Sequence, residues 1–327
     1  MRTIDEFQRF AGTDLYPALQ LLENERVILK KRFLVPEILI WIGFACITVP
    51  IFFVGKSWWM VAICAVACLV YAIMHSVKTS KEKKAFRSRY KERIVGPMIA
   101  FIDPALQFTP HDYIPEGLFI ESSLFMRTPD RYAGEDLVAG VVGKTALTFS
   151  EIHAEYKTEH YDSKGHKRTQ WHTLFKGIFF IADFNKHFTG RTIVLPDSAE
   201  KTFGALIGNF FQKMNFTRGK LIKLENVAFE KEFAVYGDDQ IESRYILTPE
   251  LMERLLDFKK KTKTQLHISF IASRMFVALS THENYFEPTY FRTVIDRDMI
   301  QKYYSILALV IGMVEEFNLN TRIWGKE

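Results

Sequence analysis

Two long apolar runs near the beginning of the chain are the strongest feature of its hydropathy pattern. Residues 33–55 contain a single charged side chain, Glu37, and residues 58–74 contain none. A bilayer core of about 30 Å requires roughly 20 apolar residues per helix, with a lower limit near 17. Because only two residues separate the runs, the pattern predicts a tight transmembrane helical hairpin at 33–76.

Charged positions on either side of this hairpin predict its orientation. Lysine and arginine residues cluster outside both apolar runs, whereas the connecting loop has only Lys56. The positive-inside rule therefore predicts an integral protein of the cytoplasmic (inner) membrane, with two spans and both termini in the cytoplasm. Residues 1–32 have apolar positions at helical spacing and are predicted to form an amphipathic juxtamembrane helix region.

A basic segment follows the hairpin, and residues 77–103 are predicted to form a helix that leaves the membrane. One interpretation is binding of anionic lipid headgroups, at about 1 kcal/mol per cation near the surface. The other is a topology signal on a solvated helix, and the two are compatible. The candidate lipid-facing residues are Lys78, Lys81, Lys83, Lys84 and Arg87.

From residue 104 onward the pattern changes to short alternating segments separated by turn residues. Strands are predicted at 118–125, 137–142, 145–157, 166–175, 177–183 and 193–195, followed by a helix at 197–215. A second cycle has strands at 221–230, 233–236, 266–271 and 275–280 and helices at 248–261 and 296–317. The predicted fold class is therefore α+β: a transmembrane hairpin, then a cytoplasmic antiparallel sheet with helices at 104–327. This part forms one domain or two similar lobes, 104–217 and 218–327.

Composition narrows the functional classes. The chain has 327 residues and a net charge of +5. Both charge signs are mixed throughout 104–327, which argues against nucleic acid as a partner. All the cysteines, Cys46, Cys64 and Cys68, lie in the apolar runs, so we expect no disulfide framework and no thiol metal site elsewhere.

The tripeptide Gly143-Lys144-Thr145 resembles the end of a phosphate-binding loop. Such a loop needs another glycine five residues before Gly143, where the chain has Val138, and it must open a helix. The following residues alternate as in a strand, with a change of phase that a bulge near Ser150 would explain. We therefore predict a hairpin turn at Gly143-Lys144 and no nucleotide binding.

Histidine and carboxylate residues are dense between residues 151 and 172, and they supply the one candidate metal site. The candidate ligands are His153, Glu155 and His172, because imidazole and carboxylate suit zinc and other divalent transition metals. Their spacing matches no established metal motif, and the polar outer face of a hairpin would give the same pattern. No G-x-S-x-G, H-E-x-x-H or kinase motif is present.

Several phrases between residues 90 and 300 resemble the bacterial membrane-protein family known as domain of unknown function 3137. The phrases are ESSLF at 121–125, YAGED at 132–136, FSE at 149–151, FKGIFFIADFN at 175–185, LENVAFEKEFAVY at 224–236 and RYILTP at 244–249. A paired membrane helix before the domain is similar to that family's usual layout. The resemblance implies architecture and bacterial membrane location, and it carries no activity, cofactor or catalytic residue.

These observations lead to two functional hypotheses. The first is a non-enzymatic, membrane-tethered cytoplasmic binding or scaffold module. Its expected partners are the bilayer, anionic lipid headgroups, another membrane protein or a second copy of the chain. The alternative is a membrane-tethered metal-dependent hydrolase that uses the cluster near residues 151–172. No cofactor is predicted under the first hypothesis, and a divalent metal is predicted under the second.

Overall fold

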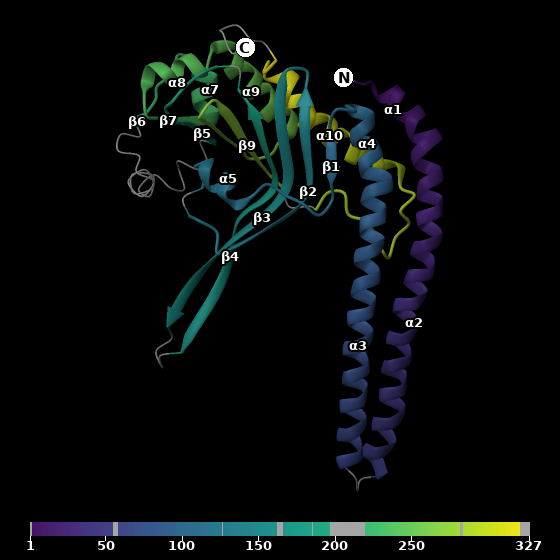
Figure 1. The fold of residues 1–327 in the computed structure, drawn as a ribbon. Coiled ribbons are helices and arrows are strands. Elements are labelled where there is room, and N and C mark those ends of the chain that lie inside the picture. Colours follow the sequence, from purple (N-terminus) through teal and green to yellow (C-terminus); the bar gives the residue numbers. More distant parts are fainter. Residues whose placement is uncertain are drawn as a thin grey trace. The chain divides into compact units, whose positions relative to one another are not determined.

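The structure is a computed structural model that describes residues 2–54, 58–125, 127–161, 166–184, 186–196, 220–281 and 284–320. Only the backbone is described at 34–41, 44–54, 58–62, 64 and 65. Contacts divide the chain into two compact units. Unit 1 comprises mainly residues 99–285 and 304–327, and unit 2 comprises residues 2–98 and 286–303. Figure 1 shows the elements of both units along the chain.

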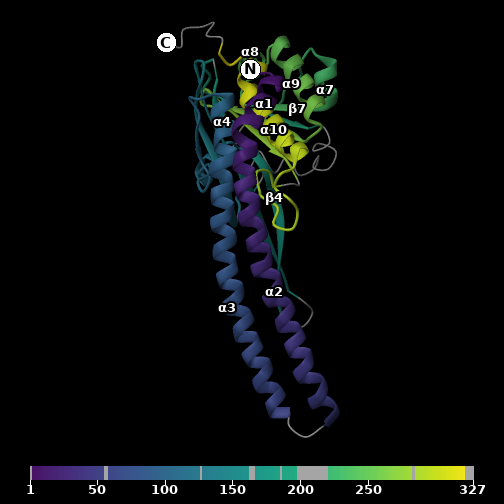
Figure 2. The same cartoon turned by 90° about the vertical axis from the view of Figure 1, so that its right-hand side faces the viewer.

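Unit 2 is built on two long antiparallel helices, α2 (Tyr16–Val54) and α3 (Trp58–Tyr90), which lie side by side in Figures 1 and 2. Before them, α1 (Ile4–Phe10) starts with a capping box, in which the side chains of Thr3 and Glu6 each accept from the other's backbone N–H. Two π-helical turns, η1 (Ala11–Leu15) and η2 (Lys91–Val95), connect α1 to α2 and α3 to α4 (Gly96–Ile102). Each connection is therefore a wider helical turn.

Ion pairs and a returning segment hold the two helices of unit 2 together. Arg89 on α3 contacts Glu25 on α2 at 2.9 Å. Residues 286–303 pack on the same helices, and the Tyr290 hydroxyl donates to the Lys83 carbonyl at 3.1 Å. The fully buried Lys91 ammonium lies 3.1 Å from the Glu287 carboxylate, which compensates for its desolvation.

The predicted transmembrane hairpin at 33–76 is contradicted. Among the described residues, no helix combines the length and the apolar character needed to cross a membrane. α2 and α3 contain the two apolar runs and extend well beyond them into charged sequence. For most residues of the two runs, only the backbone is described.

This finding corrects three predictions that depended on the hairpin. The α+β fold class keeps its antiparallel sheet and helices but loses its transmembrane element. The two-span inner-membrane location is not supported, and neither is the description of the protein as membrane-anchored. What remains from the hydropathy pattern is a pair of adjacent helices joined near residue 56.

Unit 1 is built on one antiparallel sheet, in which nine described strands have the order β1-β2-β3-β4-β9-β8-β5-β7-β6. The strands are β1 (Gln107–Thr109), β2 (Arg131–Val142), β3 (Thr145–Tyr161), β4 (Lys167–Asp183), β5 (Thr192–Pro196), β6 (Lys220–Leu221), β7 (Phe233–Gly237), β8 (Leu266–Ile271) and β9 (Arg274–Ser280). Because β5 lies between β8 and β7, strands from 104–217 and 218–327 interleave. The sheet is therefore not two similar lobes.

Helices of unit 1 follow local signals where a cap is present. In α9 (Pro249–Thr262) the Thr248 hydroxyl accepts from the Leu251 N–H, and a proline occupies the first turn, which confirms the predicted start. The predicted strand at 221–230 is wrong beyond Leu221, because Asn226 caps α7 (Val227–Glu232). Two further described helices are α8 (Gln240–Ile246) and α10 (Arg297–Glu316), which enters unit 1 at Tyr304. The helix predicted at 197–215 lies outside the described residues.

The core on one face of the sheet is rich in phenylalanine. Phe119 lies in α5 (Glu116–Glu121), and its ring centroid is 5.2 Å from that of Phe179 on β4. Residues 118–125 were predicted to form a strand, and this prediction is wrong because Pro115 precedes a short helix that places Phe119 over the sheet. Phe175 and Phe276 belong to the same buried cluster.

The region around Gly143-Lys144 is a two-residue turn between β2 and β3, as predicted. Gly143 has φ of +63°, which glycine adopts without strain. A bulge occurs near Ser150, as predicted, but its extra residue belongs to β2, where Asp136 and Leu137 lie opposite Ser150. β3 itself pairs with β4 without a shift from Leu147 to Ala154. The alternation of apolar residues along β3 changes phase because one face of the strand is buried near Leu147 and the opposite face is buried near Ile152.

Candidate functional site

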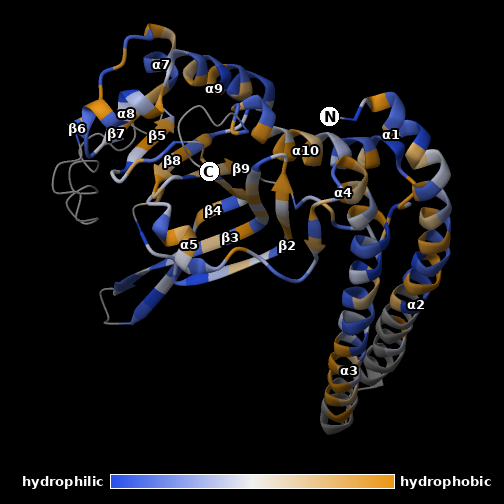
Figure 3. Cartoon of the chain, turned by 45° about the horizontal axis from the view of Figure 1, so that its top comes forward, coloured by the Kyte–Doolittle hydropathy of each residue, from blue (hydrophilic) through white to orange (hydrophobic). Residues whose placement is uncertain are grey.

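β3 and β4 extend beyond the strands on either side of them. β2 pairs with β3 only as far as Glu155, and β9 pairs with β4 only from Gly177 onward. Residues 156–161 and 167–172 pair only with each other among the described strands, and we call them the outer ribbon. Figure 1 shows this ribbon projecting from the sheet, and Figure 3 shows that it is mainly hydrophilic.

One face of the outer ribbon carries ion pairs, and we call it the ion-paired face. Glu159 lies 2.9 Å from Lys167 and 3.8 Å from Lys157. The hydrogen bond from Lys167 lowers the pKa of Glu159 below its ordinary value. Arg131 stacks over the Trp171 ring at 3.5 Å and lies 4.0 Å from the Glu155 carboxylate. Both carboxylates of this face therefore have cationic partners.

The opposite face, which we call the cationic face, has a different composition. Its described ribbon residues are Tyr156, Thr158, His160, Arg168, Gln170 and His172. The Tyr156 and His172 rings stack at 5.0 Å, and Arg127 lies 4.6 Å above the Tyr156 ring. Thr158 and His172 are joined by a hydrogen bond of 2.8 Å. No carboxylate occurs among the described ribbon residues of this face.

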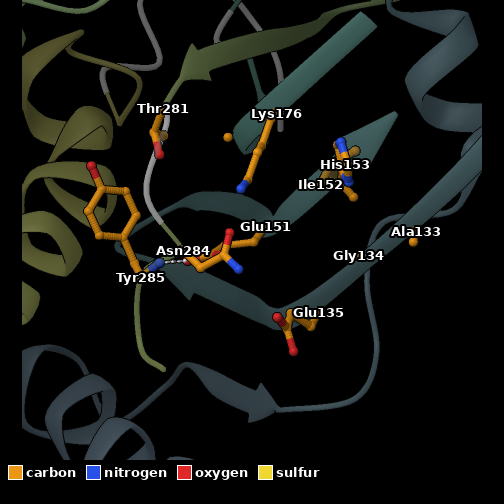
Figure 4. Close-up of a pocket in the computed structure, with 11 residues that line it drawn as sticks. Ala133, Gly134, Glu135, Glu151, Ile152, His153, Lys176, Thr281, Asn284 and Tyr285 are labelled. Atoms are coloured by element: carbon orange, nitrogen blue, oxygen red, sulfur yellow. Dashed lines mark hydrogen bonds between the residues drawn. The ribbon is translucent and has the colours of Figure 1, made fainter. Parts of the chain in front are cut away.

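A cavity of about 210 Å³ lies at the base of the ribbon, where β4 separates from β9. Figure 4 shows Glu151 near its centre, Glu135 on one side and Lys176 on another. The Glu151 carboxylate accepts from the Tyr285 N–H at 2.9 Å, and the Lys176 carbonyl accepts from the Thr281 N–H at 2.9 Å. The segment after β9 is thereby held over the sheet.

The β-bulge in β2 brings carboxylates together beside this cavity. Consecutive strand residues normally point to opposite faces, but the oxygens of Glu135, Asp136 and Glu151 all lie within 4.8 Å of one another. Asp136 has φ of +63° within the bulge, a conformation that aspartate tolerates better than most residues. An all-carboxylate set suits oxygen-preferring cations such as Ca²⁺ or Mg²⁺ better than zinc.

The sequence-predicted metal ligands are only partly brought together. His153 Nε2 lies 3.9 Å from Glu155 Oε1, since both belong to one face of β3. His172 pairs with Tyr156 and lies on the opposite face of the ribbon. His153 contributes to the rim of the cavity (Figure 4), whereas Glu155 and His172 do not line it. The three side chains therefore do not form one coordination site in this arrangement.

The sequence-predicted lipid-facing cations all lie in the last turns of α3. Lys78, Lys81 and Lys84 are exposed. Arg87 instead contacts the Glu287 carboxylate at 2.8 Å, and the Lys83 ammonium lies 4.9 Å from the Phe33 ring. Two of the five candidates therefore make contacts within unit 2, and lipid binding by the others stays a prediction.

Sequence reasoning missed both the outer ribbon and the carboxylate group. Glu135 and Asp136 adjoin a predicted strand, but adjacent acidic residues at a strand end are too common to predict a site. The length of the ribbon depends on where β2 and β9 end, and no local signal in β3 or β4 marks those points. The available signal was the long, mainly polar run from residue 155 to residue 172.

Comparison with known protein families gives a match over part of the chain. Residues 173–319 match the family model described as "Protein of unknown function (DUF3137)". The predicted resemblance is confirmed. The matched segment begins at the base of the outer ribbon and includes β4 from Thr173, β5, β7, β8 and β9. No curated protein and no solved structure matches the chain, and the description of the family names no activity.

Proposed function

We propose that the protein is a binding module that uses the outer ribbon to bind another protein. The observation that carries this proposal is the extension of β3 and β4 beyond both neighbouring strands. An isolated two-stranded ribbon is at best marginally stable in water and adds no core. Its stacked pairs, Arg131 on Trp171 and Tyr156 on His172, keep side chains ordered on an exposed surface.

The backbone of the ribbon supports the same function. A strand edge without a neighbour presents N–H and C=O groups that can pair with another chain. At the β3 edge, the Asp130 carboxylate accepts from the Lys157 N–H at 2.9 Å. At the edge of β4 that faces away from β3, no described strand pairs with residues 167–173. An added strand would therefore align with β4.

A hydrolase is less well supported by the geometry. The three predicted ligands lie on two faces of the ribbon, and the carboxylate group at the cavity includes none of them. The binding function requires only the exposed ribbon itself, so it is the simpler proposal.

The proposal is tested by site-specific photo-crosslinking in the cells that produce the protein. A photoreactive amino acid replaces Thr169 or Gln170 in the full chain, and the control replaces Ile241, which is 81% exposed on α8. We expect discrete protein adducts from the two ribbon positions and none of the same mass from position 241. Mass spectrometry then identifies the adduct, and the purified partner is titrated with the full chain.

A shortened chain supplies the decisive comparison. Residues 156–172 are replaced by Asn-Gly, which joins the paired residues Glu155 and Thr173 through a tight turn. We expect at least a tenfold weaker affinity for the identified partner, with an unchanged unfolding midpoint. Equal affinity of the shortened and full chains would overturn the proposal, and so would adducts that form equally at position 241.

A further inference from the structure

We propose that the cationic face of the outer ribbon binds an extended acidic segment of the partner protein. This inference rests on the proposed function and adds the chemistry of the partner. It is carried by the distribution of carboxylates between the two faces: Glu159 lies on the ion-paired face, whereas the described ribbon residues of the cationic face include none.

Charge complementarity distinguishes the two faces. On the ion-paired face, Glu159 is already matched by Lys157 and Lys167. On the cationic face, Arg168 lies opposite His160, and the described ribbon residues of that face include no carboxylate. An acidic ligand therefore gains attraction on the cationic face without displacing an existing ion pair.

The arginine next to the base of the ribbon is already positioned for such a ligand. Arg127 lies over Tyr156, whose ring stacks on His172, and Thr158 holds His172 by a hydrogen bond. A stacked guanidinium keeps its edge available for bidentate pairing with a carboxylate. Because the stack restricts its rotamers before binding, less conformational entropy is lost on association.

The strand edge sets the spacing of the ligand. A segment that adds to the β4 edge points alternate side chains to the cationic face, at intervals of about 6–7 Å. Arg168, Gln170 and His172 occupy the same face at the same interval, because each is two residues from the next. Acidic residues at every second position would thus meet a cation or a hydrogen-bond donor along the ribbon.

Nucleic acid is a poorer match for this face. Among the described residues of this face, two arginines, Arg127 and Arg168, supply permanent positive charge, whereas tight binding to nucleic acid uses about 6–10 phosphate contacts. A short acidic segment requires only a few charge-assisted hydrogen bonds, which are among the strongest polar contacts. The observations therefore favour protein, and nucleic acid becomes one outcome of the test.

The test measures binding of defined probes to the full chain by fluorescence anisotropy. The probes are a ten-residue peptide of alternating Glu and Thr, the corresponding Lys–Thr peptide and a ten-nucleotide single-stranded DNA. The variants are R168E on the cationic face and K167E, its neighbour on the ion-paired face. Both substitutions change the net charge equally, so a general electrostatic effect would weaken binding to the same extent.

We expect the Glu–Thr peptide to bind at least tenfold more tightly than the Lys–Thr peptide. R168E should weaken that binding about tenfold, and K167E less than twofold, because one charge-assisted pair contributes 1.4 kcal/mol or more. Equal effects of the two variants, or tighter binding of the DNA, would overturn the inference. If crosslinking identifies a partner whose affinity R168E leaves unchanged, this inference alone fails. If no partner crosslinks at the ribbon, the proposed function fails first.

Discussion

The inner and outer parts of β3 and β4 belong to the same two strands but have opposite roles. In the inner part, Phe179 is fully buried and its ring packs against those of Phe119 and Phe276. In the outer part, Tyr161 is 69% exposed, and the side chains contact mainly each other. Backbone pairing between the strands is continuous across both parts apart from one register shift near Glu155.

The difference shows that strand pairing alone does not produce a core. Neighbouring strands and covering helices bury the inner part, and both neighbours end at the base of the ribbon. Hydrophobic burial stabilises the inner part, whereas the outer part depends on cross-strand pairs of about 0.2–1 kcal/mol each. The outer part is therefore the region in which substitutions change recognition rather than folding.

The largest expected effect is in the inner part. Phe179→Ala removes a fully buried ring and should lower the free energy of unfolding by about 3–5 kcal/mol. The matched control on the same strand is Gln170→Ala in the outer ribbon, for which we expect a change of less than about 0.5 kcal/mol. Urea denaturation of the full chain measures both values. Similar losses for both variants would contradict the division between the two parts.

A smaller effect is expected where the two parts meet. Gly177 has φ of +152°, and a β-carbon added there would lie 2.0 Å from the Leu279 carbonyl oxygen. Gly177→Ala should therefore destabilise the protein by about 2–3 kcal/mol, because the backbone must shift. The control is Gly117→Ala in α5, where a β-carbon would meet no atom within 4 Å. If Gly177→Ala leaves the free energy of unfolding unchanged in denaturation measurements, β4 and β9 separate easily at this point.

The smallest effect concerns an ion pair in the outer ribbon. In NMR titration, the Glu159 pKa should lie below 4.5, since Lys167 donates to its carboxylate. This pairing stabilises the folded state above the unfolded pKa and is lost as the pH falls through the lowered folded value. Lys167→Ala should return the Glu159 pKa toward 4.5 more completely than Lys157→Ala does. A larger effect of Lys157→Ala would mean that the ribbon has a different register.

Local sequence signals predicted the elements for which the capping residue, the turn residues and the spacing of apolar positions all indicate the same structure. The helix that starts at Pro249, the hairpin of β8 and β9 and the turn at Gly143 are of this kind. The strand prediction at residues 118–125 failed because an apolar run of that length fits a strand or a buried helix turn equally well. The transmembrane prediction rested on the length of two apolar runs alone, and among the described residues no helix is long and apolar enough to cross a membrane.

The candidate site could be predicted from the sequence less completely than the fold. Glu151 and His153 belong to the polar cluster that the sequence singled out, and both line the cavity. Their neighbour Glu135 comes from β2, and the bulge that turns Asp136 toward it has no clear mark in the sequence. His153 and Glu155 share a face because they are two residues apart on β3, but the face of His172 depended on the register between β3 and β4.

The sequence by itself determined the local features of this protein: many of its strands and turns, its capped helices, and the mainly polar run from 155 to 172. These features depend on backbone propensity and on side-chain period, which act over a few residues. The tertiary structure alone decided that β2 and β9 end early and leave β3 and β4 to continue as a ribbon. It also decided which ribbon face lacks carboxylates, because strand register and the extent of neighbouring strands arise from contacts between distant parts of the chain.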